Sequence, residues 1–302
     1  MQHVPLPGLL HRRGRARHLA HPRSLRAGRL LHRHRRVRVH ERRAPLRVRG
    51  RRADGAPRGV NLLLLEPEEI DAYGEATVTG TRAKHLIDVL GVQPGQSVRA
   101  GIVDGGVGRA DVRAVEAGRV RLALRVGEPP EPPPLDLLLA VPRPKVLKRL
   151  WAPIASLGVG RVWLTNAEKV ERFYFDSHAV RPETYRPRLL EGLAQARDTR
   201  VPVVEVHKSL KALVEDRIEP LDARRVLADP EFDRGAYETV AGTSPGRRVI
   251  LALGPEGGWS AYERDLFLRH GFVGVGMGPR VLRLDTAVVA LLSLAHEALR
   301  SR

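Results

Sequence analysis

The stretch Val249–Leu299 reads VILALGPEGGWSAYERDLFLRHGFVGVGMGPRVLRLDTAVVALLSLAHEAL and decides the fold. Val249–Leu253 is short, apolar and branched, as expected of a buried parallel strand, and Phe272–Val275 is a second such run. A glycine-bearing loop and then a helix follow each strand, which predicts an α/β fold with a parallel sheet. Ligands bind beyond the carboxyl ends of the strands in such sheets. We therefore expect two loops, after two neighbouring strands, to form a site.

Local signals place the two helices of this stretch. Ser260 with Glu263 three residues later is a capping box, which predicts a helix start. Gly271 predicts the end of that helix. A second helix is expected to start near Asp285 or Thr286 and to run to the C-terminus.

The loops themselves restrict the ligand. The first is Gly254-Pro255-Glu256-Gly257-Gly258, and the second runs over residues 276–283. Neither has the Gly-Lys-Ser/Thr ending of a phosphate loop or the spacing of a dinucleotide fingerprint. Glycines allow close approach to the backbone, which suits a nucleoside without phosphate, such as S-adenosylmethionine. The residues alone leave a second interpretation open, in which both loops are ordinary tight turns.

The two loops together resemble a known family. The first loop, the Ser-x-x-Glu helix start and the pattern Gly278-x-x-Val281-Leu282-Arg283-x-x-Thr286-Ala287 are similar to the C-terminal signature of the RsmE family of 16S rRNA (uracil-N3)-methyltransferases. Leu284-Asp285 departs from the more usual Thr-Glu, although Asp keeps the charge. The resemblance implies a C-terminal SPOUT-type knotted methyltransferase domain, a homodimer and S-adenosyl-L-methionine as cofactor. It also implies 16S rRNA, within the assembled small ribosomal subunit, as partner. Two alternatives stay open: a non-catalytic RNA-binding protein, and a SPOUT methyltransferase that acts on another RNA.

The resemblance further implies which residues form the site. The expected cofactor-binding residues are Leu227, Ala228, Leu253, Gly254, Pro255, Glu256, Gly257, Gly258, Met277, Gly278, Val281, Leu282 and Arg283. N3 of uracil carries a proton at neutral pH, and a cation near O2 or O4 would stabilise the anion left by its removal. Arg283 is the first candidate for that cation. Glu256 or Asp285 would accept the proton or hold Arg283 in place. Alternatively, Glu256 is only a carboxylate favoured by a helix N-terminus.

Composition excludes several classes of protein. The 302 residues suffice for two domains. The chain has no cysteine, so disulfides and thiolate metal sites are impossible, and a reducing compartment such as the cytoplasm is expected. No apolar run approaches the roughly 20 residues that span a bilayer, so no membrane partner is expected. The histidines of residues 60–302 are scattered, and we predict no metal site.

The net charge of +18 is concentrated at the N-terminus. Residues 1–59 hold eighteen arginines, no lysine and two acidic residues, without a sustained hydrophobic period. Such a segment is expected to be a disordered extension. It is a nucleic-acid arm, a transit peptide or translated sequence upstream of the natural start. We favour the last, because Val60–Pro67 resembles the beginning of an RsmE-type protein.

Residues 60–128 have a β texture. Short apolar runs with glycine turns, such as Asp104–Gly106, suggest a small barrel, and one helix is expected over Thr81–Leu90. By resemblance this is a PUA-like RNA-binding domain in which Arg82, Lys84 and His85 contact RNA phosphates. The alternative is that these side chains form the solvated face of the helix. The family usually has Arg at the position of Gly91.

Pro129–Pro134 is a polyproline linker, after which residues 135–302 form the methyltransferase domain. Leu135–Val141, the helix from Pro144 to Leu157 and Val162–Leu164 make a βαβ unit. The basic residues near that helix start are candidate RNA contacts or ordinary surface charges: Lys145, Lys148 and Arg149.

The middle of this domain is less distinctive. The aromatic segment Ala167–Arg181 either stacks on bases or, as we favour, packs as a loop or subunit contact. A helix is expected over Glu183–Ala196 and a strand over Val203–Val206. Between them Arg197 and Arg200 are candidate phosphate contacts, although the family has Ser-Gly-Arg where this chain has Ala-Arg-Asp. The strand Val226–Ala228 ends at Asp229-Pro230 and should end beside the glycine loops.

Overall fold

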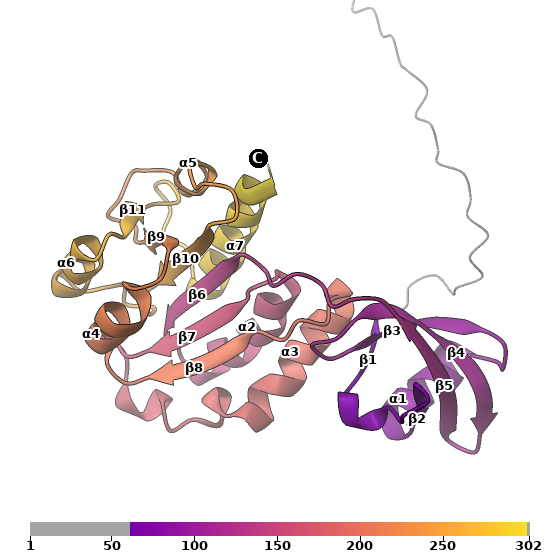
Figure 1. Ribbon diagram of the computed structural model, residues 1–302. Helices are drawn as coiled ribbons and strands as arrows, with labels where there is room; N and C mark the ends of the chain where they lie inside the picture. The colour runs from indigo at the N-terminus through magenta and orange to yellow at the C-terminus, as the bar shows by residue number, and fades with distance from the viewer. Residues whose placement is uncertain (1–60, 301–302) are drawn as a thin grey trace, which may run out of the picture. The chain divides into compact units, whose positions relative to one another are not determined.

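The computed structural model describes residues 61–300, so the predicted extension and the start at Val60 lie outside it (Figure 1). Its larger sheet has six strands in the order β11-β9-β10-β6-β7-β8, and every neighbouring pair is parallel. The strands are β6 (Leu135–Ala140), β7 (Arg161–Thr165), β8 (Val203–His207), β9 (Ala223–Ala228), β10 (Arg248–Leu253) and β11 (Val273–Val275). The predicted parallel α/β sheet is confirmed.

The expectation that β10 and β11 are neighbours is wrong. Strand β9 lies between them and pairs with both, Leu251 opposite Val226 on one side and Val275 opposite Ala228 on the other. Strand pairing is non-local, so the order in the chain did not reveal this insertion. All three strands still point the same way, and their carboxyl ends meet at one edge.

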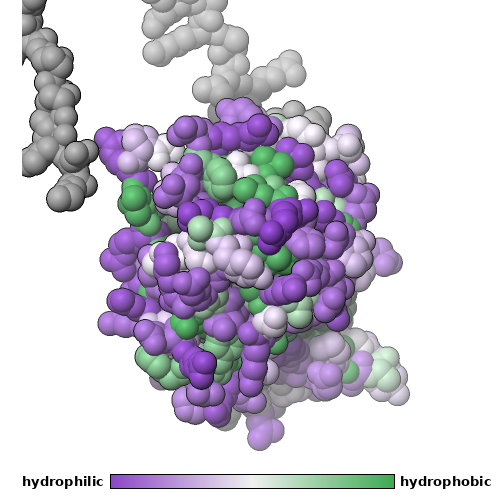
Figure 2. Space-filling model, turned by 90° about the vertical axis from the view of Figure 1, so that its left-hand side faces the viewer, coloured by the Kyte–Doolittle hydropathy of each residue, from purple (hydrophilic) through white to green (hydrophobic). Residues whose placement is uncertain are grey.

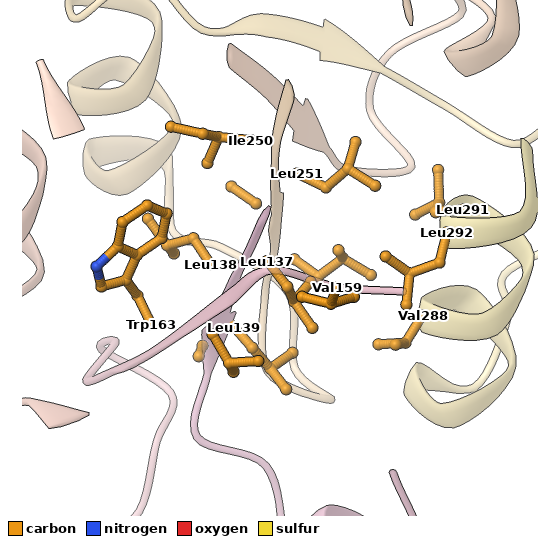
Figure 3. Close-up of a cluster of buried hydrophobic side chains, with 14 of the residues drawn as sticks. Leu137, Leu138, Leu139, Val159, Trp163, Ile250, Leu251, Val288, Leu291 and Leu292 are labelled. Carbon is orange, nitrogen blue, oxygen red and sulfur yellow. The ribbon is translucent and has the colours of Figure 1, made fainter. Parts of the chain in front are cut away.

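The central strands of the sheet are buried on both faces, which explains the continuous apolar runs in β6 and β10. All six residues of β6 are buried. Leu137 and Leu251 lie toward Val288 and Leu291 of α7, whereas Trp163 of β7 lies on the opposite face (Figure 3). Alternation along each strand therefore supplies two apolar layers.

Helices connect the parallel strands. They are α2 (Pro144–Ser156), α3 (Pro182–Ala196), α4 (Leu210–Ala212, continuing as a π-helix over Leu213–Ile218), α5 (Ala236–Ala241), α6 (Ala261–Arg269) and α7 (Leu284–Arg300). Short 3-10 turns at Arg172–Tyr174 and His178–Val180 interrupt the aromatic segment. The predicted capping box of α6 is present, because the Glu263 carboxylate accepts the Ser260 N–H at 2.8 Å and the Ser260 hydroxyl accepts the Glu263 N–H. Gly271, with φ of +76°, ends that helix.

The smaller sheet has five strands in the order β1-β3-β4-β5-β2. These are β1 (Leu63–Leu65), β2 (Glu75–Val78), β3 (Ser97–Ile102), β4 (Val107–Glu116) and β5 (Arg119–Val126). The pair β1–β3 is parallel and the other pairs are antiparallel. The expected barrel is only partly present, because the sheet is curled and open: the edge strands have only three and four residues, and each pairs with one neighbour.

One helix crosses this curled sheet, as predicted. It begins as α1 (Gly80–Lys84) and continues with the wider turn of a π-helix over His85–Val89. Ala83 and Leu86 are its buried residues. A 3-10 turn at Pro67–Glu69 precedes β2. None of the helices within residues 61–300 meets the length and apolarity needed to cross a bilayer.

Candidate functional site

A cavity of about 680 Å³ lies where the carboxyl ends of β9, β10 and β11 meet. Its walls come from four parts of the chain: Ala228–Glu231, Leu253–Trp259, Val275–Gly278 and Arg280–Asp285, with further residues from α2, α6, α7 and the segment after β7. The volume is within the range of small-molecule sites. The sheet therefore brings the two glycine loops together, as the carboxyl-end rule predicts.

Twelve of the thirteen residues expected to bind the cofactor line this cavity: Ala228, Leu253, Gly254, Pro255, Glu256, Gly257, Gly258, Met277, Gly278, Val281, Leu282 and Arg283. Leu227 does not, because its side chain is fully buried within β9. The expected catalytic residues Arg283, Glu256 and Asp285 also line it.

Glycines shape both loops. Gly258 (φ +70°) and Gly278 (φ +85°) have left-handed backbone conformations that L side chains rarely adopt. At Gly276 a Cβ would lie 1.9 Å from the Phe232 carbonyl oxygen, so no side chain fits there. At Gly254 a Cβ would lie 3.2 Å from the buried Trp259 ring. The glycines thus serve turn geometry and close packing at the cavity wall.

The first loop is tied to neighbouring segments. The Glu256 carboxylate accepts the backbone N–H of Arg143, just before α2, at 3.1 Å. The Lys169 ammonium donates to the Gly257 carbonyl oxygen at 2.8 Å. The next residue back, Glu168, donates its N–H to the Glu263 carboxylate at 2.7 Å. The loop is therefore held from the ends of β6 and β7 as well as by its own helix.

Charged side chains contact one another at the second loop. The Asp285 carboxylate accepts a hydrogen bond from Arg149 of α2 at 2.8 Å, and its other oxygen lies 3.6 Å from Nε of Arg283. The N–H of Thr286 donates to that same oxygen at 3.1 Å. The side chain of Arg283 is 75% exposed, whereas that of Asp285 is 27% exposed. Arg149 therefore contacts the site residue Asp285 rather than being only a surface charge.

Several cavity residues were not identified from the sequence. Asp229 is buried, lies 3.6 Å from Nη1 of Arg264 and accepts the Glu231 N–H at 3.0 Å. The sequence predicted that the strand before it ends beside the glycine loops, which is confirmed, but it assigned Asp229 no role. Arg143 and Lys169 follow β6 and β7 in the same way, but no motif marks them.

The candidate RNA contacts fall into two groups. Six of the seven are exposed, and Arg200 is half-buried; the first group is Lys84, His85, Lys145, Lys148 and Arg197, and the second is Arg82 and Arg200, which bind other parts of the chain. Arg82 instead pairs with Glu69 and donates to the Leu64 carbonyl oxygen at 3.0 Å. The hydrogen bond from Arg82 lowers the pKa of Glu69, and the pKa of Arg82 is raised by the same bond. Arg200 donates to the Pro130 carbonyl oxygen at 2.7 Å.

The lining suits an adenosyl amino acid. Backbone groups of two glycine loops lie beside apolar side chains, including Leu253, Met277 and Leu282, which can contact a base. Charges of both signs, such as Asp229 and Arg264, are present for the amino and carboxylate groups of a methionine moiety. In the part of the chain that the structure describes, no group of three or more His, Asp or Glu side chains could hold a metal ion.

Comparisons with known proteins show the family to which the chain is similar. A family model described as an RNA methyltransferase domain matches residues 129–296. Ribosomal RNA small subunit methyltransferase E of Treponema pallidum is 31% identical over 252 residues, which are 78% of this chain and 92% of that protein. The protein of the same name from a Synechocystis species is 29% identical over 245 residues, covering 79% and 78% of the two chains.

Solved structures show the same fold. Ribosomal RNA small subunit methyltransferase E from Neisseria gonorrhoeae, bound to S-adenosyl methionine, has a TM-score of 0.63 at 18% identity and covers 79% of this chain and 98% of its own. A methyltransferase from Legionella pneumophila in complex with the same cofactor has a TM-score of 0.62 at 22% identity, with coverage of 79% and 98%. At these identities the likeness concerns the fold.

Proposed function

The chain belongs to the ribosomal RNA small subunit methyltransferase E (RsmE) family, and from this premise we propose that it transfers a methyl group from S-adenosylmethionine to N3 of a uridine in 16S rRNA. One observation carries the proposal. The two loops of the family signature, which follow non-adjacent strands, meet in one cavity with the guanidinium of Arg283 among its lining residues.

The backbone of the two glycine loops would hold S-adenosylmethionine, with Leu253 and Met277 against the adenine. When bound, the cofactor supplies a methyl group already activated on a cationic sulfonium. The chain's own residues therefore have to position the acceptor and to raise its nucleophilicity. Asp229 and Arg264 are suited to the charged groups of the methionine end.

The acceptor nitrogen must lose its proton before it can attack. Arg283 would stabilise the resulting negative charge on O2 or O4 of the uracil, because a fixed cation favours the anion over the neutral base. Glu256 is the better placed proton acceptor of the two candidate carboxylates. It is exposed and accepts one N–H through Oε1, whereas Asp285 already contacts two arginines.

We assign RNA contacts to the exposed basic residues Lys84, His85, Lys145, Lys148 and Arg197. Such side chains position a nucleic acid through its phosphates without reading sequence. Arg82 and Arg200 have partners within the chain, so RNA would have to share or displace those contacts.

The finer architecture follows the family. Residues 60–128 are proposed as a PUA-like domain and residues 135–302 as a SPOUT domain with a trefoil knot. The knot is proposed from the family alone; in the structure the second loop contacts an earlier segment, where the Gly276 N–H donates to the Arg234 carbonyl oxygen at 2.9 Å. We also place the protein in the cytoplasm, because ribosomes are assembled there.

A homodimer through α7 is part of the same proposal. Val289 and Leu294 of that helix are 39% and 37% exposed although its other face is buried. The face seen in Figure 2, on the side of α4 and α6, is mainly hydrophilic with small hydrophobic patches. The exposed apolar residues of α7 support that helix as the contact with a second copy.

Mass spectrometry of 16S rRNA from a deletion strain tests the function. N3-methyluridine should disappear, return with the wild-type gene and remain absent with the Arg283→Ala variant. An unchanged N3-methyluridine signal in the deletion strain would refute the proposal.

A further inference from the structure

Asp285 occupies an unusual position for a catalytic base. One oxygen accepts from Arg149, and the other accepts from the Thr286 N–H and lies near Arg283. Both carboxylate oxygens are therefore engaged, and three groups of the chain contact them. The geometry therefore suits a bridge between two arginines.

Arg149 reaches this bridge from a different element. It lies on α2, 136 residues before Asp285, and it is not among the cavity-lining residues. Asp285 and Arg283 do line the cavity. Arg149 would thus act on the reaction through Asp285 without lining the cofactor cavity.

The contact between Arg149 and Asp285 changes the net charge beside the cavity. Arg283 and Asp285 alone form a neutral pair, which would attract a uracil anion weakly. Adding Arg149 leaves one net positive charge in the cluster, so Asp285 can hold Arg283 without cancelling its effect. The side chain of Arg283 is 75% exposed, and an arginine that is not held samples many rotamers.

We propose that Arg149 is a positioning residue, whose ion pair with Asp285 fixes the guanidinium of Arg283 beside the cavity and preserves its net positive charge. This rests on the proposed methyltransferase function. Asp285 is the bridge, and proton acceptance belongs to another group. α2 and the residue before it thus contact both loops, since the N–H of Arg143 donates to Glu256.

Steady-state kinetics on small subunits that lack the methyl group separates this role from others. Arg149→Ala should lower kcat about tenfold, within the roughly hundredfold that a misplacement of about 1 Å can cost. The KM for S-adenosylmethionine and its calorimetric Kd should change less than about twofold, because Arg149 does not line the cavity. Arg149→Lys should recover part of the rate. The proposal would be overturned if Arg149→Ala had the kcat of the wild type. It would also be overturned if the variant lost cofactor affinity by the same factor as it lost kcat.

A double-mutant cycle separates a bridge from a base. If Asp285 is a bridge, Arg149→Ala combined with Asp285→Asn is no slower than the slower single variant. If Asp285 is the base, Asp285→Asn alone costs on the order of 10²–10⁴ in rate. Arg149→Ala would then also move the acidic limb of the pH–rate profile upward, because the carboxylate loses a neighbouring cation. Additive losses or a shifted limb contradict the proposal.

Arg247→Ala is the matched control. It removes an ion pair of similar length, 2.7 Å from Nε of Arg247 to Asp222. Arg247 lies just before β10, at the amino end of the strand and away from the cavity. It should leave kcat unchanged. A general effect of losing an arginine would appear in both variants.

Failure of the proposed function is recognised separately, because the wild-type protein would then not methylate the subunits. In that case ¹⁵N relaxation of the Arg283 Nε–H, assigned by its absence in Arg283→Lys, still tests the contact. Arg149→Ala should increase its motion relative to wild type. Equal motion in the two proteins would overturn the positioning role.

Discussion

Gly278→Ala tests whether the second loop is built for a ligand. Gly278 has φ of +85°, and a Cβ added there would meet nothing within 4 Å. The substitution therefore introduces backbone strain without a clash. A left-handed conformation costs an L residue about 1–2 kcal/mol. The variant loop is exposed, so it can relax to negative φ when the cavity is empty.

Binding would then have to restore the left-handed conformation. At about 1.4 kcal/mol per tenfold, the Kd for S-adenosylmethionine should rise roughly 5- to 30-fold, as measured by isothermal titration calorimetry. Gly246→Ala is the control, because Gly246 has φ of +78°, equally open space and a place in the turn before β10. It should lower the Tm and leave the Kd unchanged. An unchanged Kd for Gly278→Ala, or an equal increase for Gly246→Ala, would refute this reasoning.

Three further substitutions address the chemistry and the stability of the fold. Arg283→Ala should lower kcat strongly while the calorimetric Kd for S-adenosylmethionine stays within about twofold, since the side chain is assigned to the uracil anion; normal turnover would contradict that role. Arg248→Ala should lower the free energy of unfolding by about 3 kcal/mol in urea titrations, because it strands the buried Asp136 carboxylate, which it now binds with two nitrogens; a loss below about 1 kcal/mol would show that water replaces the pair. Burial lowers the pKa of His296 from its ordinary value of 6.5, so the unfolded chain binds the proton more readily and stability should fall as pH drops below about 6.5. Urea titrations at several pH values should show a smaller fall in the free energy of unfolding for His296→Gln than for the wild type. An identical pH dependence of the two proteins would show that His296 is not the cause.

Local signals identified the elements of the sheet well. Val249–Leu253, the capping box at Ser260 and the turn at Gly271 are each determined within a few residues, and the structure has all three. The helix over Leu210–Ile218 was missed although its signal is present. Its buried residues recur at helical spacing, and the Ser209 hydroxyl accepts the Ala212 N–H.

Non-local contacts could not be read from the sequence. The insertion of β9 between β10 and β11 depends on pairing between segments far apart in the chain. The contact of Arg149 with Asp285 spans 136 residues, and no motif connects them. The different hydrogen-bond partners of Glu256 and Asp285 could not be read from the sequence either. The residues that line the cavity were predictable where they lie in one loop.

Transfer of an isotopically labelled methyl group tests the central claim most directly. Purified protein is incubated with S-adenosylmethionine carrying a deuterated methyl group and with small ribosomal subunits that lack the modification, and the digested 16S rRNA is examined by mass spectrometry. The prediction is a single labelled N3-methyluridine that is absent with Arg283→Ala. No labelled nucleoside, or label only on a ribose or another base, would contradict it.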